Sequence, residues 1–189
     1  MMKSRPSTHS ANGRLRTMTR LGLAILILTS PAHAAEVKQD GFTVRLQGAI
    51  ETGDTDRLYQ TLRKSGIVPT RVILDSKGGD VREAHRLARY IRVDIKAVTE
   101  VQNECWSACI LAFAGGIQRY AGPNADLRVH RAAVNGEDSP EASSRIAGEY
   151  KVFGIPNYIT KMMLDTPATT FARLSDMDLV GWALRKGID

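Results

Sequence analysis

The spacing of apolar residues changes several times along the chain after residue 35. Alternating apolar and polar positions around Val44 and Leu46 predict a strand, and the short β-branched run at residues 72–74 predicts a strand buried on both faces. Apolar positions three or four residues apart, closed by Ser65-Gly66, predict a helix between these two strands. Further strands are expected around residues 95–98 and 127–130, and further helices over about residues 81–92 and 106–115.

The pattern becomes helical beyond residue 130. Helices are expected over about residues 140–153, 156–164 and 175–186, with proline and glycine at the joins, and residues 135–139 are expected to form a mobile loop. Strands that alternate with helices form a parallel sheet. The sequence therefore predicts an α/β domain with a mainly parallel sheet and C-terminal helices.

The segment before residue 35 has the anatomy of a secretory signal peptide. Basic residues between positions 14 and 20 precede eight apolar residues, and Ala32-His33-Ala34 supplies a small-x-small cleavage site. Eight residues span about 12 Å as a helix, far short of the roughly 20 residues that a membrane-spanning helix needs. We therefore expect residues 1–34 to be cleaved, no stable membrane span after cleavage, and a single domain of residues 35–189 that is periplasmic or secreted.

Positive charge is concentrated in this leader. The whole chain carries a formal net charge of +6, but residues 1–34 hold five lysines and arginines and no acidic residue, which leaves 21 basic and 20 acidic residues in the mature chain. A net charge of +1 removes the main electrostatic argument for nucleic-acid binding. We therefore expect no nucleic-acid partner.

The chain contains two cysteines, Cys105 and Cys109. Their spacing corresponds to one helical turn, and an exported protein can keep a disulfide, so both a bridge and a pair of buried thiols agree with the sequence. A metal site is not expected, because the cysteines lack a second ligand pair and the mature chain keeps only His85 and His130. No metal and no other cofactor is predicted.

Three short segments place reactive groups at a strand end or at a helix start. Gly78-Gly79 follows the strand at residues 72–74 and could direct main-chain amides at a ligand, although glycine pairs are also common in tight turns. Ser107 opens an apolar helix, where the helix dipole and the Ala108 amide favour a developing negative charge, but it could equally be a simple N-cap. His130 ends a buried strand, where the ordinary alternative is a core histidine.

The order of these segments, with the Arg-Tyr-Ala-Gly-Pro-Asn run at residues 119–124, resembles the Clp-type (ClpP) serine peptidases of the ClpP/crotonase superfamily. The chain also looks like small exported ClpP-like proteins whose nucleophile lies within a Cys-x-Ser-Ala-Cys segment. The resemblance covers residues 70–132 well and the remainder loosely. It implies a spiral of β-β-α units. The site residues that it implies are Ser107 as nucleophile, His130 as general base, and the amides of Ala108 and of Gly78 or Gly79 as the oxyanion hole.

The resemblance also implies an aspartate from a later helix, in an Asp-Thr context before a phenylalanine. Asp165, with Phe171 beyond it, fits this context, although Asp165 could equally be a helix cap. Two features depart from the family pattern: Lys77 replaces a proline, and the 35 residues between His130 and Asp165 leave little room for the long handle helix of Clp rings. Related peptidases of the superfamily use a Ser-Lys pair, for which Lys151 is the candidate.

Two functions of different kinds follow from these residues and from the resemblance. The first is an exported serine peptidase that cleaves peptides or unfolded segments, because an exported enzyme has no access to ATP-driven unfoldases. The second is a catalytically silent module that pairs extended peptides along the glycine edge. Crotonase-type acyl-CoA chemistry also stabilises an oxyanion with main-chain amides but needs no Ser-His pair. The resemblance to Clp rings is also compatible with a homo-oligomer.

Overall fold

The computed structural model describes residues 34–185, with side chains up to residue 184. The chain divides between residues 30 and 31, so the described residues all belong to the second part, Pro31–Asp189. The expected signal peptide therefore lies outside the described residues, apart from Ala34. None of the helices within residues 34–185 is both long and apolar enough to cross a membrane.

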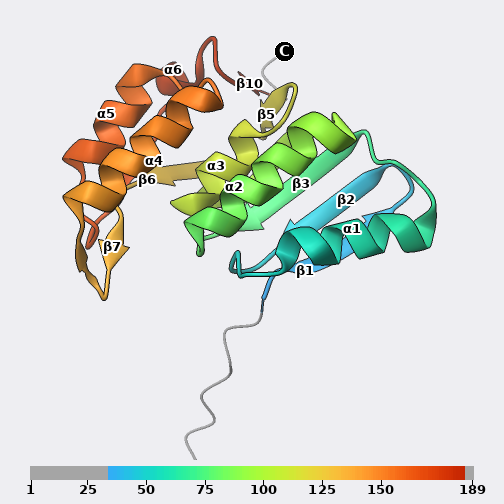
Figure 1. The fold of residues 1–189 in the computed structure, drawn as a ribbon. Coiled ribbons are helices and arrows are strands. Elements are labelled where there is room, and N and C mark those ends of the chain that lie inside the picture. The colour runs from blue at the N-terminus through green and yellow to red at the C-terminus, as the bar shows by residue number, and fades with distance from the viewer. Residues whose placement is uncertain (1–33, 186–189) are drawn as a thin grey trace, which may run out of the picture. The chain divides into compact units, whose positions relative to one another are not determined.

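Eight strands of the described chain form one sheet. They are β1 (Glu36–Asp40), β2 (Thr43–Gln47), β3 (Arg71–Ser76), β4 (Val98–Trp106), β5 (Arg119–Ala121), β6 (Asp126–Val129), β9 (Ala172–Arg173) and β10 (Leu184–Arg185). The order is β1-β2-β3-β4-β5-β10, and β6 pairs with β4 and β9 (Figure 1). Within this sheet, β1 pairs antiparallel with β2, β9 pairs antiparallel with β6, and all the other pairs are parallel. The mainly parallel α/β architecture predicted from the sequence is confirmed.

The long strand β4 is shared between two neighbours. Residues 99–101 pair with β5, whereas residues 104–106 pair with β6. The sheet therefore splits along β4, and the carboxyl end of β4 lies between β3 and β6. This arrangement brings three strand ends together at one edge.

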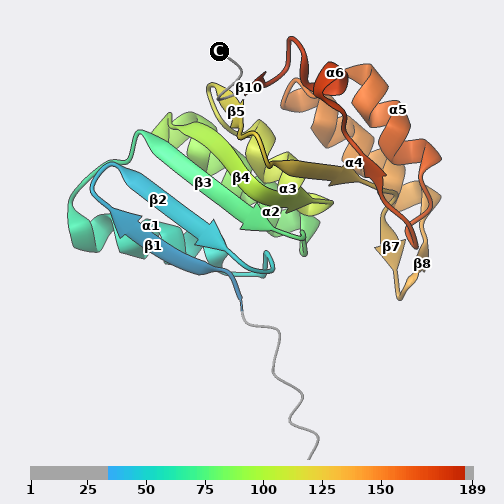
Figure 2. The same ribbon diagram turned by 180° about the vertical axis from the view of Figure 1, so that it is seen from behind.

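Helices cover one face of the sheet. α1 (Asp54–Ser65), α2 (Val81–Arg89) and α3 (Ala108–Ala114) lie on the same side of β2, β3 and β4, and no helix of residues 34–185 lies on the opposite side of these strands (Figure 2). A π-helix, η1 (Tyr90–Ile95), continues α2. The C-terminal part contains α4 (Pro140–Val152), α5 (Asn157–Asp165) and the short α6 (Asp176–Leu179).

Local chemistry explains where the first helices begin and end. The Asp80 carboxylate accepts hydrogen bonds from the Arg82 and Glu83 amides and so caps the start of α2. Gly66 ends α1 with a φ of 68°, a left-handed conformation that glycine adopts without a Cβ clash. At the start of α4, Ser139 accepts a hydrogen bond from Ala142.

The core is centred on α3, which is buried along its whole length. Its residues are all apolar, and Gly115 directly after it allows α2 to approach closely: a Cβ on Gly115 would lie 2.5 Å from the Cα of Ala88. Phe113 packs edge-on against Trp182, with ring centroids 5.5 Å apart. The Thr99 hydroxyl donates to the Phe113 carbonyl and ties the helix to β4.

The structure corrects several expected boundaries in the first half of the chain. β1 was not expected at all, and the strand expected at residues 95–98 begins at Val98 and runs to Trp106. Polar residues on β4 concealed it, among them Glu100, which is buried and pairs with Arg71 at 3.0 Å. The helix expected at residues 81–92 leaves the α conformation after Arg89.

Two corrections concern the second half. The loop expected at residues 135–139 belongs instead to a hairpin of β7 (Ala133–Val134) and β8 (Glu137–Asp138), whose turn holds Asn135 and Gly136 at positive φ. Such an Asn-Gly pair is a strong hairpin signal. The helix expected at residues 175–186 is reduced to α6, and the chain then forms β10 beside β5.

Candidate active site

The three segments singled out in the sequence meet at the carboxyl ends of adjacent parallel strands. Gly78-Gly79 follows β3, Ser107 follows β4, and His130 follows β6. Ser76 is in register with Cys105, Trp106 is in register with Arg128, and the Ser107 amide donates to the Arg128 carbonyl at 2.9 Å. Ligand sites of open α/β sheets form at this end of the strands.

Ser107 occupies a sharp turn between β4 and α3. Its backbone has φ 53° and ψ −123°, and its hydroxyl makes no capping hydrogen bond to α3. A sparsely populated backbone conformation of this kind costs roughly 1–3 kcal/mol, and such conformations cluster at functional sites. A strand-to-helix turn also holds the nucleophilic serine of α/β-hydrolases. The N-cap alternative therefore loses its main support.

The glycine turn packs directly against Ser107. A Cβ on Gly78 would lie 2.8 Å from the Cβ of Ser107, and one on Gly79 would lie 2.1 Å from the Ile50 carbonyl oxygen. Both glycines also have positive φ values, 99° and 141°. Only glycine fits at either position without moving the backbone.

Two main-chain amides beside Ser107 are free to bind an anion. Within residues 34–185, neither the Gly79 amide nor the Ala108 amide has a hydrogen-bond acceptor. The Gly78 amide, in contrast, donates to the Ser76 hydroxyl at 3.1 Å. Of the two glycines that the sequence left open, Gly79 is therefore the one whose amide is available.

Ser107 and His130 line one cavity of about 200 Å³, together with Gly79 and Ala108. The remaining wall is mostly apolar and is formed by Val81, Leu111, Ala132, Ala133, Ile146 and Tyr150. Burial raises the pKa of Tyr150, which keeps this wall uncharged. A larger cavity of about 790 Å³ shares Val81, Ala132, Ala133 and Ile146 with the first, so the two are neighbours.

His130 is half-buried, and its ring packs on Phe171 with centroids 4.6 Å apart. Burial lowers the pKa of His130, whereas the nearby main chain of Ala168 and the charge of Asp138 act in the opposite direction. The Nδ1 atom is buried and has no hydrogen-bond partner among the described residues. With its pKa below the usual value, the imidazole is neutral at pH 7 and can accept a proton.

The structure does not bring the expected third residue to His130. Asp165, at the end of α5, is exposed and forms an ion pair with Lys161. Lys151, the candidate for a Ser-Lys pair, is exposed on α4 and does not line the cavity. The carboxylate whose charge acts on His130 is that of Asp138, in the hairpin that the sequence did not predict.

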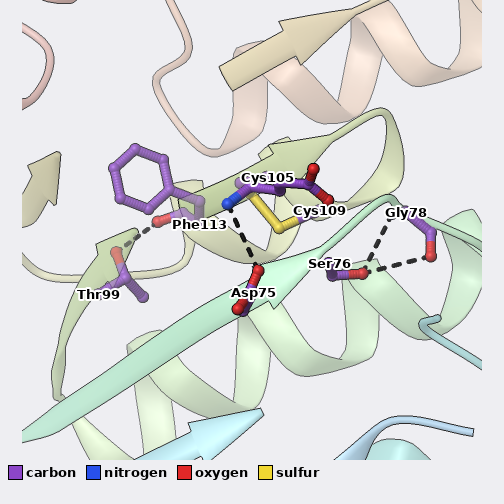
Figure 3. Close-up of a disulfide and its surroundings, with 8 residues drawn as sticks. Asp75, Ser76, Gly78, Thr99, Cys105, Cys109 and Phe113 are labelled. Carbon is purple, nitrogen blue, oxygen red and sulfur yellow. Dashed lines mark hydrogen bonds between the residues drawn. A yellow bond between two sulfur atoms is a disulfide. The ribbon is translucent and has the colours of Figure 1, made fainter. Parts of the chain in front are cut away.

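Cys105 and Cys109 form a disulfide, with their Cα atoms 5.2 Å apart (Figure 3). They do not lie on one helix: Cys105 is near the end of β4, and Cys109 lies in the first turn of α3. Both are completely buried, and the ring that they close contains Ser107 at its centre. The bridge thus links the two elements that hold Ser107. Within the described residues, no three His, Cys, Asp or Glu side chains gather as a metal site would require.

Comparison with known proteins identifies the fold. No family model and no curated protein matches the chain. Among solved structures, ClpP1 from Listeria monocytogenes is 20% identical, with a TM-score of 0.55 over 72% of this chain and 84% of that one. A mutant of the 1510-N membrane-bound stomatin-specific protease is 13% identical, with a TM-score of 0.55 over 78% and 79%.

A third neighbour comes from a different enzyme class. An enoyl-CoA hydratase from Mycobacterium avium subsp. paratuberculosis K-10 is 12% identical, with a TM-score of 0.51 over 82% of this chain and 69% of that one. Identities of this size establish the architecture and leave the chemistry to the site itself. The split parallel sheet, its three converging strand ends and these neighbours together show that the chain has the ClpP/crotonase fold.

Proposed function

We propose that the protein is an exported serine peptidase that cleaves peptides or unfolded protein segments. The observation that carries this proposal is the single cavity lined by Ser107, His130 and two free amides, those of Gly79 and Ala108. These are the parts that acyl transfer requires: a nucleophile, a base, and donors for the developing oxyanion. The fold, shared with two peptidases, is compatible with this activity.

The proposed reaction has two steps. His130 takes the proton of Ser107 as the oxygen attacks the peptide carbonyl, and the amides of Gly79 and Ala108 stabilise the oxyanion. The protonated imidazole then gives the proton to the departing amine, which leaves an acyl-enzyme. Water, activated by His130, attacks this ester, releases the carboxylate product and restores Ser107.

An extended substrate agrees with the shape of the site. The cavity at Ser107 lies next to the larger one, which is lined from α2 and α4 by residues that include Arg82, His85, Arg145 and Glu149. A peptide chain could occupy both at once, whereas the 200 Å³ cavity alone accepts little more than one side chain. Export from the cytoplasm, proposed from the leader, would leave flexible peptides and unfolded tails as the accessible substrates.

The second candidate is a silent peptide-binding module. The observation in its favour is that Asp165 pairs with Lys161, so that His130 lacks the carboxylate contact of a complete triad. In this case the glycine edge and the two cavities would bind extended peptides without cleaving them.

A peptide-cleavage assay separates the two candidates. The purified exported protein is incubated with a mixed peptide library and with an unfolded protein, and products are identified by mass spectrometry. We expect cleavage that is lost in Ser107→Ala and His130→Ala and kept in Lys151→Ala, which tests the Ser-Lys alternative. Peptide binding without cleavage by the unaltered protein would instead support the silent module, and loss of cleavage in Lys151→Ala would support a Ser-Lys enzyme.

A further inference from the structure

The segment of residues 166–171 lies against His130. Phe171 packs on the imidazole ring at 4.6 Å. At the other end of the segment, the Arg131 amide donates to the Thr166 carbonyl at 2.9 Å, and the Arg131 Nε donates to the same oxygen at 3.3 Å. The strand end that carries His130 is therefore attached to this segment next to the imidazole.

Asp138 completes the attachment. One of its carboxylate oxygens accepts a hydrogen bond from the Ala168 amide at 2.5 Å, and the other pairs with Arg131 Nη2 at 3.0 Å. Asp138 is itself held by the hairpin, where it is in register with Ala133. A single carboxylate thus joins the residue after His130 to the middle of the segment that covers His130.

From these contacts we infer that Asp138 is the positioning residue of His130, fixing the 166–171 segment around the imidazole and supplying the negative charge that a proton on the ring requires. This role is the one that the resemblance implied for Asp165. The inference rests on the proposed function only in taking His130 as the base, because the contacts of Asp138 exist whatever reaction the site carries out.

The charges around His130 favour Asp138 as the effective carboxylate. Residues 166–171 carry no charged side chain, and on the β4 side Trp106 and Ser107 are uncharged. The α4 residues that line the cavity are Ile146, which is uncharged, and Tyr150, whose pKa burial raises, and Asp165 is paired with Lys161. Arg131 is the nearby cation, and it is paired with Asp138. The Asp138 charge raises the pKa of His130 against the effect of burial.

A nuclear magnetic resonance titration of His130 tests the inference without any need for activity. The mature chain holds two histidines, so the His85→Gln variant assigns the imidazole signals. We expect Asp138→Asn to lower the His130 pKa by about half a unit to one unit, since removal of a nearby anion disfavours the protonated ring. Asp165→Asn is the matched control and should leave this pKa unchanged. An unchanged value in Asp138→Asn, or an equal shift in both variants, would overturn the inference.

A second readout separates positioning from mere stabilisation. The rate of serine labelling by a fluorophosphonate is measured against pH for the same variants and for Asp138→Glu, which restores the charge. Asp138→Asn should move the acidic side of the pH–rate profile to lower pH and reduce the maximal labelling rate up to about tenfold, because His130 becomes a weaker base. Asp138→Glu should recover part of both. A lower rate with an unmoved acid limb, and no recovery in Asp138→Glu, would contradict the inference.

The two proposals fail in different ways. If the unaltered protein is not labelled at any pH, the proposed function fails, but the titration of His130 still decides the role of Asp138. If labelling occurs and Asp138→Asn behaves like Asp165→Asn, the function stands and the inference is wrong.

Discussion

Ser107 is held in its conformation by its neighbours in space. Gly78 leaves room for its Cβ, the Arg128 carbonyl accepts its amide hydrogen, and the flanking cysteines close a covalent ring around it. The hydroxyl makes no capping hydrogen bond to α3, and Ser107 lines the cavity shared with His130. A conformation that costs free energy persists where the surrounding structure enforces it.

The fit between Gly78 and Ser107 leads to a first prediction. Gly78→Ala places a methyl group 2.8 Å from both the Ser107 Cβ and the Trp106 carbonyl oxygen, so we expect the free energy of unfolding to fall by about 1–3 kcal/mol and Ser107 to lose reactivity. Gly66→Ala is the matched control, because Gly66 also has a positive φ but its Cβ would meet no atom within 4 Å. Denaturant unfolding and probe labelling of both variants provide the measurements. Equal losses in both would show that the contact with Ser107 has no effect.

For single residues, the sequence predicts the two candidate reactive side chains more readily than the residues that surround them. Ser107 and His130 follow from the order of the motifs, since each lies where a strand ends. Whether Gly78 or Gly79 supplies the free amide depends on which of the two donates a hydrogen bond to the Ser76 hydroxyl. Residue spacing does not reveal this contact. Asp138 was missed because strands of two residues have too short a pattern to predict.

The disulfide acts between elements, joining β4 to α3. Its closed ring is short, so loop-closure entropy alone gives it about 2 kcal/mol of stability. We predict that the Cys105→Ala/Cys109→Ala double variant loses at least about this amount in denaturant unfolding.

The same burial predicts how the bridge responds to reductant. Both cysteines are fully buried, so dithiothreitol should release no thiol from the native protein and two thiols once the protein is unfolded. Thiol titration with and without denaturant is the test. Rapid reduction of the native protein would contradict a permanent structural bridge.

Glu83 joins α2 to the start of α1. Its buried side chain accepts a hydrogen bond from the Thr55 amide at 2.7 Å and pairs with Arg86 at 3.1 Å. Burial by itself would raise the pKa of Glu83, but the hydrogen bonds from Thr55 and Gly53 and the charge of Arg86 outweigh burial and lower it. The stability that the carboxylate contributes is therefore present above its unfolded pKa of about 4.3 and is lost as the pH falls through the lower folded value.

The corresponding prediction is that Glu83→Gln costs about 1–3 kcal/mol at pH 7 and progressively less below pH 4. Glu141→Gln is the control, since Glu141 forms an exposed pair with Arg145 and should change stability by less than about 0.5 kcal/mol. Unfolding curves at pH 7 and pH 3 measure both variants. A difference between unaltered protein and Glu83→Gln that stays constant from pH 7 to pH 3 would refute the role given to the charge.

Strands with an unbroken run of buried apolar residues were the easiest to predict from the sequence. β3 reads as an apolar run because residues 72–74 are buried on both of its faces, whereas β4 was cut short because its buried and half-buried positions include polar residues such as Glu100 and Gln102. The split of β4 between β5 and β6 depends on strand pairing far apart in the chain. Residue order alone does not predict such pairing.

At the scale of the whole molecule, the expected cleavage point lies just before β1, the first strand of the described chain. Ala35, the first residue after that point, is only 2% exposed. We predict that the exported protein starts at Ala35. Intact-mass measurement of protein recovered from the periplasm or the medium tests this, and recovery of residues 1–34 on that protein would refute it.

Architecture alone does not choose between the functions that this fold supports. The solved neighbours include peptidases and an enoyl-CoA hydratase at similar TM-scores, so the assignment depends on the residues at the carboxyl ends of β3, β4 and β6. Only two of the proposed groups, the Ser107 hydroxyl and the His130 imidazole, are specific to acyl transfer through a covalent intermediate. The amides of Gly79 and Ala108 would serve either chemistry.

The central claim is that His130 activates Ser107, and covalent labelling with a fluorophosphonate tests it most directly. The purified exported protein is treated with the probe, and the adduct is mapped by mass spectrometry. We predict one adduct, on Ser107, that is absent from Ser107→Ala, reduced at least about a hundredfold in His130→Ala, and unchanged in Ser175→Ala, whose hydroxyl is engaged in capping α6. No adduct on the unaltered protein, or an adduct that survives in Ser107→Ala, would contradict the account.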